Sequence, residues 1–97
     1  MKKPYPWGRE FCDFYLKYNN GMAVWTELKV DENNRINYAQ ATESDIQKLS
    51  RISAPNTMKY AVLISRLTYI ESEISVFPFN KVKTKGGTYN IWVIPCG

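Results

Sequence analysis

The sequence predicts an α+β domain: a two-layer structure with an antiparallel sheet, in the order β-β-β-α-α-β-β, and two helices packed on one face. Three observations support it, namely strand-like alternation of apolar residues over 10–40, helical spacing over 42–74, and a two-glycine turn near the end. The chain has 97 residues. That length suits one modest core, so we expect residues 1–97 to form a single domain.

The chain is mildly basic, with 13 Lys and Arg against 9 Asp and Glu and a net charge of +4. The excess lies at the two ends, which suits an acidic partner such as nucleic acid or a protein surface. Ordinary solubility explains a charge of this size equally well. The Lys- and Asn-rich, Arg-poor composition is typical, by association only, of small proteins from phages and other mobile elements.

Several kinds of chemistry are disfavoured. The chain has no His, which removes the usual general base and the commonest metal ligand. Its two cysteines cannot form a structural zinc site without His, and no glycine-rich nucleotide-binding motif is present. We therefore expect no enzyme activity, no metal and no cofactor.

The cysteine count and the hydropathy bear on location. Cys12 and Cys96 could form one disulfide, but free thiols in a reducing compartment are the default. The first residues lack the apolar segment of a signal peptide, and no apolar run reaches the length of a membrane span. We expect a cytoplasmic protein without a membrane partner.

Residues 1–9 are expected to form an extended arm, because Pro4 and Pro6 disfavour the helical conformation in the residues before them. Two interpretations remain open for this arm. It is either a disordered end or a basic, aromatic segment that binds a partner.

Residues 10–30 predict a hairpin. Asn19-Asn20-Gly21 fits a three-residue loop with Gly21 in the left-handed conformation. The pairing that follows places one apolar set on the predicted core face: Cys12, Phe14, Leu16, Val24, Thr26 and Leu28. The opposite face carries Phe11, Tyr15 and Trp25, which would meet solvent, a partner or the N-terminal arm.

The polar cluster at 31–35 predicts a second turn and a third strand over 36–40, with Leu28 opposite Tyr38. Helical spacing follows. Thr42 is the expected N-cap of a first helix, which ends before Pro55. A second helix is expected from about residue 56 to 74, although its β-branched residues leave a strand over part of 69–77 open.

Gly86-Gly87 predicts a tight hairpin that closes the chain, since both glycines accept a positive φ. Alternation then assigns two faces. The predicted core face carries Val82, Thr84, Tyr89, Ile91 and Val93. The predicted exposed face carries Lys81, Lys83, Lys85, Thr88, Asn90 and Trp92.

These features favour a small non-enzymatic module that binds another protein, of inhibitor or adaptor type, because interfaces are enriched in exposed aromatic residues. The alternative is a nucleic-acid-binding domain that uses the basic hairpin, with Lys on phosphates and Trp92 on a base. A homodimer built on the open sheet face is a further expectation. The candidate partner-binding residues are Lys81, Lys83, Lys85, Asn90, Trp92, Phe11, Tyr15 and Trp25.

Overall fold

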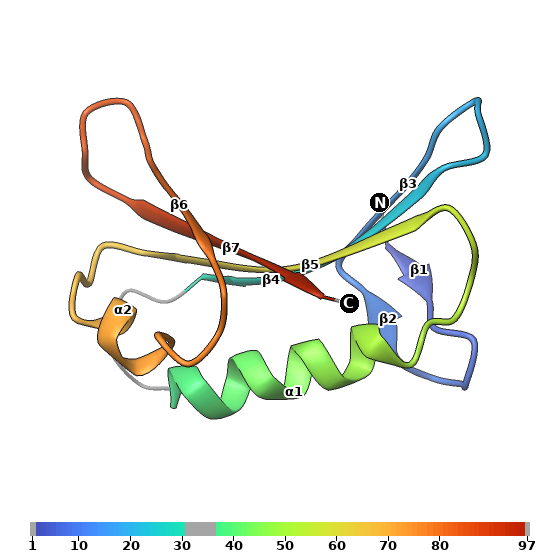
Figure 1. The fold of residues 1–97 in the computed structure, drawn as a ribbon, viewed down its shortest axis with the longest axis horizontal. Coiled ribbons are helices and arrows are strands. Elements are labelled where there is room, and N and C mark those ends of the chain that lie inside the picture. Colours follow the sequence, from blue (N-terminus) through green and yellow to red (C-terminus); the bar gives the residue numbers. More distant parts are fainter. Residues whose placement is uncertain (1, 31–36, 97) are drawn as a thin grey trace.

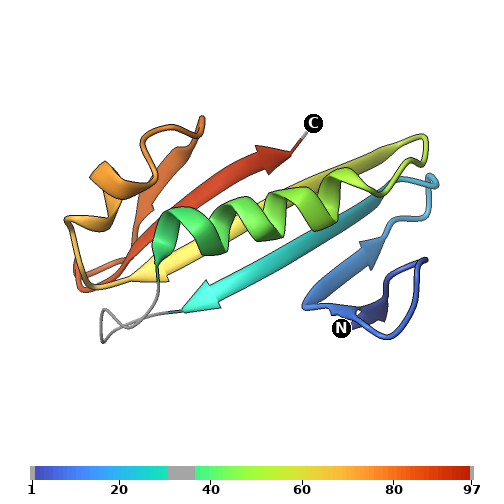
Figure 2. The ribbon, with the colours of Figure 1, turned by 90° about the horizontal axis from the view of Figure 1, so that it is seen from below.

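The computed structural model describes residues 2–30 and 37–96 and has a five-stranded sheet with its helices on one side (Figure 1). The sheet order is β3-β4-β5-β7-β6. Its strands are β3 (Phe14–Lys17), β4 (Ala23–Val30), β5 (Thr57–Ser65), β7 (Asn90–Cys96) and β6 (Asn80–Lys83). Helix α1 (Tyr38–Ser50) runs along the sheet, and the short α2 (Ile70–Glu73) lies near one end (Figure 2). The expected α+β class is confirmed.

The N-terminal arm forms a small sheet of its own. Strand β1 (Lys3–Pro4) pairs with β2 (Phe11–Cys12), so Lys3 lies opposite Cys12. The arm therefore folds back on its own chain within the described residues. The predicted hairpin register also placed Cys12 opposite Leu28. That pair is wrong, because Cys12 pairs with Lys3.

The sheet is mixed, so the prediction of a purely antiparallel sheet is wrong. Strands β4 and β5 are parallel, with Trp25 opposite Lys59, and every other neighbouring pair is antiparallel. Parallel neighbours need a crossover connection, and α1 supplies it. The predicted turn at 31–35 lies outside the described residues. The predicted pairing of Leu28 with Tyr38 is wrong, because Leu28 pairs with Val62 and Tyr38 belongs to α1.

Helix α1 is confirmed, but it begins earlier than predicted. Its N-cap is Asn37, whose side-chain oxygen accepts a hydrogen bond of 3.0 Å from the backbone N–H of Gln40. The predicted cap, Thr42, is buried inside the helix. The buried positions recur every three or four residues and include two polar side chains. The first turns were not predicted because these polar residues interrupt the apolar stripe. The buried positions are Tyr38, Thr42, Asp45 and Leu49.

The second predicted helix is wrong over most of its length. Residues Thr57–Ser65 form β5, and only Ile70–Glu73 are helical. In β5 the buried residues Ala61, Leu63 and Ser65 alternate with less buried ones. A central strand with a parallel neighbour is apolar on both faces, so its sequence also matches a helical stripe.

The registers of both predicted hairpins are confirmed. Phe14 lies opposite Thr26 and Leu16 opposite Val24 in the first hairpin. Gly21, with φ of 87°, has the expected left-handed conformation. In the last hairpin Lys81 lies opposite Trp92 and the remaining pairs follow, Val82 with Ile91 and Lys83 with Asn90.

The faces of both hairpins are opposite to the prediction. The side of the sheet that α1 covers carries Trp25, Leu63 and Trp92, all buried. Of the residues predicted to be in the core, Phe14, Leu16 and Val82 are exposed, most of the others are half-buried, and Cys12 is buried. Alternation specifies the register of a hairpin but not the side that a helix covers.

Two further observations concern the described residues. Cys12 is buried and Cys96 half-buried, and both are free thiols, as the default interpretation predicted. Neither helix is long and apolar enough to cross a membrane.

Replacing Gly87 with alanine is expected to lower the free energy of unfolding by about 1 kcal/mol, because an L side chain is strained at positive φ. Gly86 and Gly87 have φ of 93° and 73°, and the Gly87 N–H donates to the Thr84 carbonyl at 2.8 Å. Gly87→Asn is the matched control and should cost less, since Asn tolerates this conformation. Urea unfolding measures both, and an unchanged midpoint for Gly87→Ala would contradict the turn.

Candidate functional site

One side of the sheet is not covered by any described element, because both helices and the β1–β2 arm lie on the other side (Figures 1 and 2). We call this side the open face. Strand alternation and the pairing registers assign its residues. They are Phe14, Leu16, Val24, Thr26, Leu28, Val30, Met58, Tyr60, Val62, Ile64, Asn80, Val82, Ile91, Val93 and Pro95.

The open face is apolar and carries no charged side chain. Its polar groups are those of Thr26, Tyr60 and Asn80. The lysines of the same strands occupy the alternate positions and point to the helix side or its rim: Lys17, Lys29, Lys59, Lys81 and Lys83. Five of the apolar side chains on the open face are between 44% and 59% exposed, namely Phe14, Leu16, Val30, Met58 and Val82.

The sheet curves toward its open face at two ends. The β3–β4 hairpin and the β6–β7 hairpin both bend away from α1, at opposite ends of the molecule (Figure 1). This shape follows from the twist that strands of L-residues accumulate across a sheet. The open face is therefore a saddle with a hairpin at each end.

Sequence reasoning missed the open face because it assigned these residues to the core. A usable signal was present. The first hairpin and the central strand each carried two apolar faces, whereas the confirmed helix has 13 residues and one buried stripe. One helix of that length covers one face, so a second apolar face had to remain.

The predicted aromatic surface lies beneath the N-terminal arm. The ring of Tyr5 stacks on Trp25 with centroids 5.6 Å apart and on Trp7 at 4.4 Å, and Tyr15 meets Trp25 edge-on at 4.8 Å. The Lys3 ammonium lies 4.1 Å from the centre of the Tyr15 ring. Trp25 is consequently buried, and of the three alternatives for this face the one in which the N-terminal arm covers it is confirmed.

Phe11, the remaining member of the predicted aromatic surface, is 56% exposed at the edge of the small sheet. The structure thus separates the three aromatic candidates. Trp25 and Tyr15 pack beneath the arm, and Phe11 alone faces solvent.

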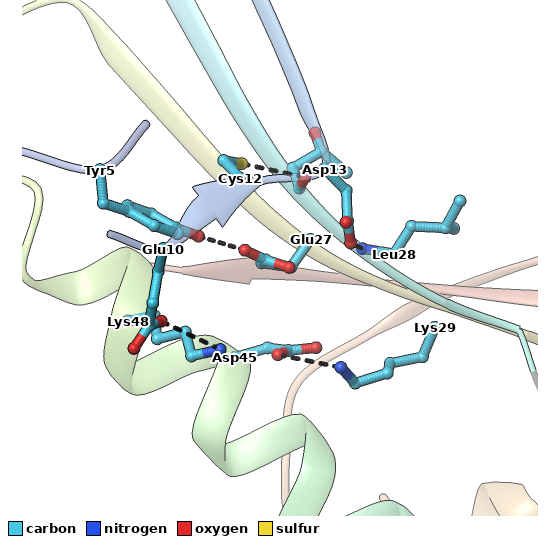
Figure 3. A network of polar contacts seen from close by, with 10 residues as sticks. Tyr5, Glu10, Cys12, Asp13, Glu27, Leu28, Lys29, Asp45 and Lys48 are labelled. Carbon is cyan, nitrogen blue, oxygen red and sulfur yellow. Dashed lines mark hydrogen bonds and ion pairs between the residues drawn. The ribbon is translucent and has the colours of Figure 1, made fainter. Parts of the chain in front are cut away.

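A buried carboxylate of the sheet forms a hydrogen bond with the arm (Figure 3). Glu27 of β4 is only 5% exposed and accepts a short hydrogen bond from the Tyr5 hydroxyl. Burial raises the pKa of Glu27 to about 7, the Tyr5 hydrogen bond opposes this rise, and the neighbouring Asp13 carboxyl adds to it. Asp13 itself accepts the Leu28 backbone N–H at 2.9 Å.

A second carboxylate, Asp45, points from α1 toward the same region (Figure 3). Its Oδ1 lies 3.6 Å from the Lys29 ammonium. Burial raises the pKa of Asp45, and the charges of Lys29 and Lys48 oppose the rise. Lys48 in turn lies 3.3 Å from the Glu10 carboxylate. These contacts tie α1, the sheet and the arm together.

The centre of the polar network is enclosed rather than open to a substrate. Glu27 and Tyr5, which share a hydrogen bond, are both buried. The Cys12 Sγ lies 3.2 Å from the carbonyl oxygens of both Phe14 and Thr26, which share its one proton, and burial raises the pKa of the thiol. Among the described residues, no group of three His, Cys, Asp or Glu side chains is placed to hold a metal ion.

The basic hairpin differs from its predicted form. Trp92 is fully buried, and its indole N–H donates to Glu71 Oε1 at 3.0 Å. The Lys81 ammonium lies 3.0 Å from the same oxygen. Asn90 is also buried, whereas Lys83 and Lys85 are exposed. The predicted combination of an exposed indole with a row of lysines is therefore wrong.

A shallow cleft of about 600 Å³ lies beyond the C-terminal end of α1. Residues 52–55, Thr57, Lys59 and Cys96 line it. The Lys59 ammonium donates to the Ile52 carbonyl at 3.1 Å. Burial raises the pKa of the Cys96 thiol, which leaves a weak nucleophile at the edge of the cleft.

Comparison of the chain with protein-family models, with curated proteins and with solved structures gives no match.

Proposed function

We propose that this chain is a non-catalytic protein-binding module, of inhibitor or adaptor type, and that the open face is its binding surface. The observation that carries the proposal is an uncharged, apolar face that extends across all five strands. Soluble proteins rarely leave a contiguous apolar patch larger than a few hundred Å² in contact with water. An exposed patch of that size marks a site that another surface covers.

The enclosed polar network supports a binding role over a catalytic one. A general acid or base must reach the proton of a bound substrate. Burial raises the pKa of Glu27 to about 7, but its carboxyl is buried and bonded to the Tyr5 hydroxyl. We therefore assign this network to holding the arm on the sheet.

The proposed surface replaces the one that the sequence suggested. Nucleic-acid binding by stacking on Trp92 has lost its geometric support, because this indole packs inside the molecule. Lys83, Lys85 and Phe11 are exposed and stay predicted contact residues outside the open face. Nucleic-acid binding is retained as an outcome of the test below.

The test is capture of a partner from a host lysate by the tagged chain, with and without nuclease and at low and high salt. A protein retained by wild type through nuclease and high salt should be lost with Met58→Glu, which places a carboxylate on the open face. Val76→Glu is the matched control, because Val76 is a 79% exposed apolar residue outside the sheet. It should retain the partner.

The contrary result is equally specific. Nucleic-acid binding would be established if nuclease removes the captured material and high salt releases it. The double variant Lys83→Glu with Lys85→Glu should then capture none. Capture that Met58→Glu leaves unchanged would show that the open face is not the binding surface.

A further inference from the structure

We infer that the open face binds a second copy of this chain, so that two sheets pack face to face between two outer layers of helices. This inference rests on the binding role proposed above for the open face and names its occupant. Three properties of the described residues lead to it: the distribution of charge, the area of the face, and the shape of the sheet.

Charge is the first property. A copy of the chain carries a net charge of +4, so an interface between two copies must keep like charges apart. Every lysine of the five strands lies off the open face at the alternate positions. Two open faces therefore meet without a charged side chain at the contact, and a symmetric pairing buries no unpaired charge.

Area is the second property. Each strand residue occupies about 16 Å² of sheet, so five strands of this length give an open face of roughly 500 Å² in projection. Side chains that stand above the sheet increase the accessible area beyond the projection. Stable complexes bury about 600–1,000 Å² on each partner, and the open face reaches the lower part of this range.

Shape is the third property. Two sheets with the same twist pack with their strands about 30° apart and the sheets about 10 Å apart, as in a β-sandwich. Copies of one sheet have the same twist by definition, so a two-fold axis satisfies this condition. The central strand β5 then lies over β5 of the other copy and places Tyr60, Val62 and Ile64 in the middle of the contact.

The polar groups on the open face are compatible with such a contact. The Tyr60 hydroxyl lies 3.7 Å from the Met58 sulfur within the same strand. Asn80 is the first residue of the edge strand β6, so it lies at the rim of the proposed interface. Polar groups at a rim stay in contact with water. Apart from Thr26 and Tyr60, the interior of the face is thus built from aliphatic and aromatic groups.

The test is sedimentation equilibrium on the purified full chain over a wide concentration range. Wild type is expected to have twice the mass of one chain. Met58→Glu and Leu16→Glu, on β5 and β3, should each raise the dissociation constant of the dimer at least about 100-fold, because each buries an unpaired carboxylate in both copies. Val76→Glu should remain a dimer. Circular dichroism must show that each variant is folded. If Met58→Glu does not fold, the dissociation constant of the edge-strand variant Leu16→Glu tests the inference instead.

Two results would overturn the inference. One is a wild-type chain that stays monomeric at the highest concentration, and the other is a dimer that survives both open-face variants. If wild type is monomeric and capture from lysate still depends on Met58, the proposed function stands with a different protein as its partner. If neither measurement depends on the open face, both proposals fail.

Discussion

Replacing Trp92 with alanine is expected to lower the free energy of unfolding by about 4 kcal/mol, because removal of a buried aromatic side chain leaves a cavity. Trp92 is fully buried on the helix side of β7. Its indole N–H also donates to Glu71, and the Lys81 ammonium lies 5.7 Å from its ring centre. Chemical denaturation at constant pH measures the change.

Two matched variants separate the causes of this loss. Trp92→Phe keeps most of the volume and removes the indole N–H, so it should cost only part of the alanine effect. Val82→Ala removes an exposed side chain from the neighbouring strand β6 and should change the stability of the monomer by less than about 0.5 kcal/mol. If Trp92→Ala lowers the free energy of unfolding as little as Val82→Ala does, Trp92 is not on the buried face of the hairpin.

Raising the pH from about 5 to 8 is expected to lower the free energy of unfolding by about 3 kcal/mol through Glu27 alone, since each unit of pKa difference is worth about 1.4 kcal/mol. Burial raises the pKa of Glu27 from 4.5 to about 7 in the folded chain. The folded state therefore binds more protons than the unfolded state. The stability that Glu27 contributes is complete below pH 4.5 and is lost as the pH rises through 7.

The variant Glu27→Gln should remove this dependence and be more stable than wild type at pH 8, because its amide oxygen still accepts the Tyr5 hydroxyl. The chain has no His, so few other groups titrate in this window. Glu43→Gln, an exposed change on α1, is the control and should keep the wild-type dependence. Equal slopes for Glu27→Gln and wild type, in urea unfolding at several pH values, would contradict the buried carboxylate.

Local sequence was sufficient for the turns and the registers. Gly21 and Gly86-Gly87 adopt positive φ, and each glycine turn fixes which residues face each other across its hairpin. Helical spacing also located most of α1. These features depend on interactions between residues near in sequence, which is why they could be predicted.

Features that depend on distant contacts could not be predicted in the same way. Strand β5 was taken for a helix, because its apolar run satisfies both periodicities until its neighbours β4 and β7 are known. The side of the sheet that the helices cover was assigned wrongly for a related reason. Trp92 was expected to be exposed, whereas it is buried on the helix side of the sheet, and only the structure shows that the arm covers Trp25.

The sequence by itself therefore determined the mixed α+β class, most of α1 and the hairpin registers. Only the tertiary structure decided which face α1 and the arm cover, and hence which face is open. The physical reason is that alternation along a strand specifies two sides without naming either. The choice depends on packing, because one face accommodates the helix and the Glu27–Tyr5 contact, and no described element covers the uncharged face.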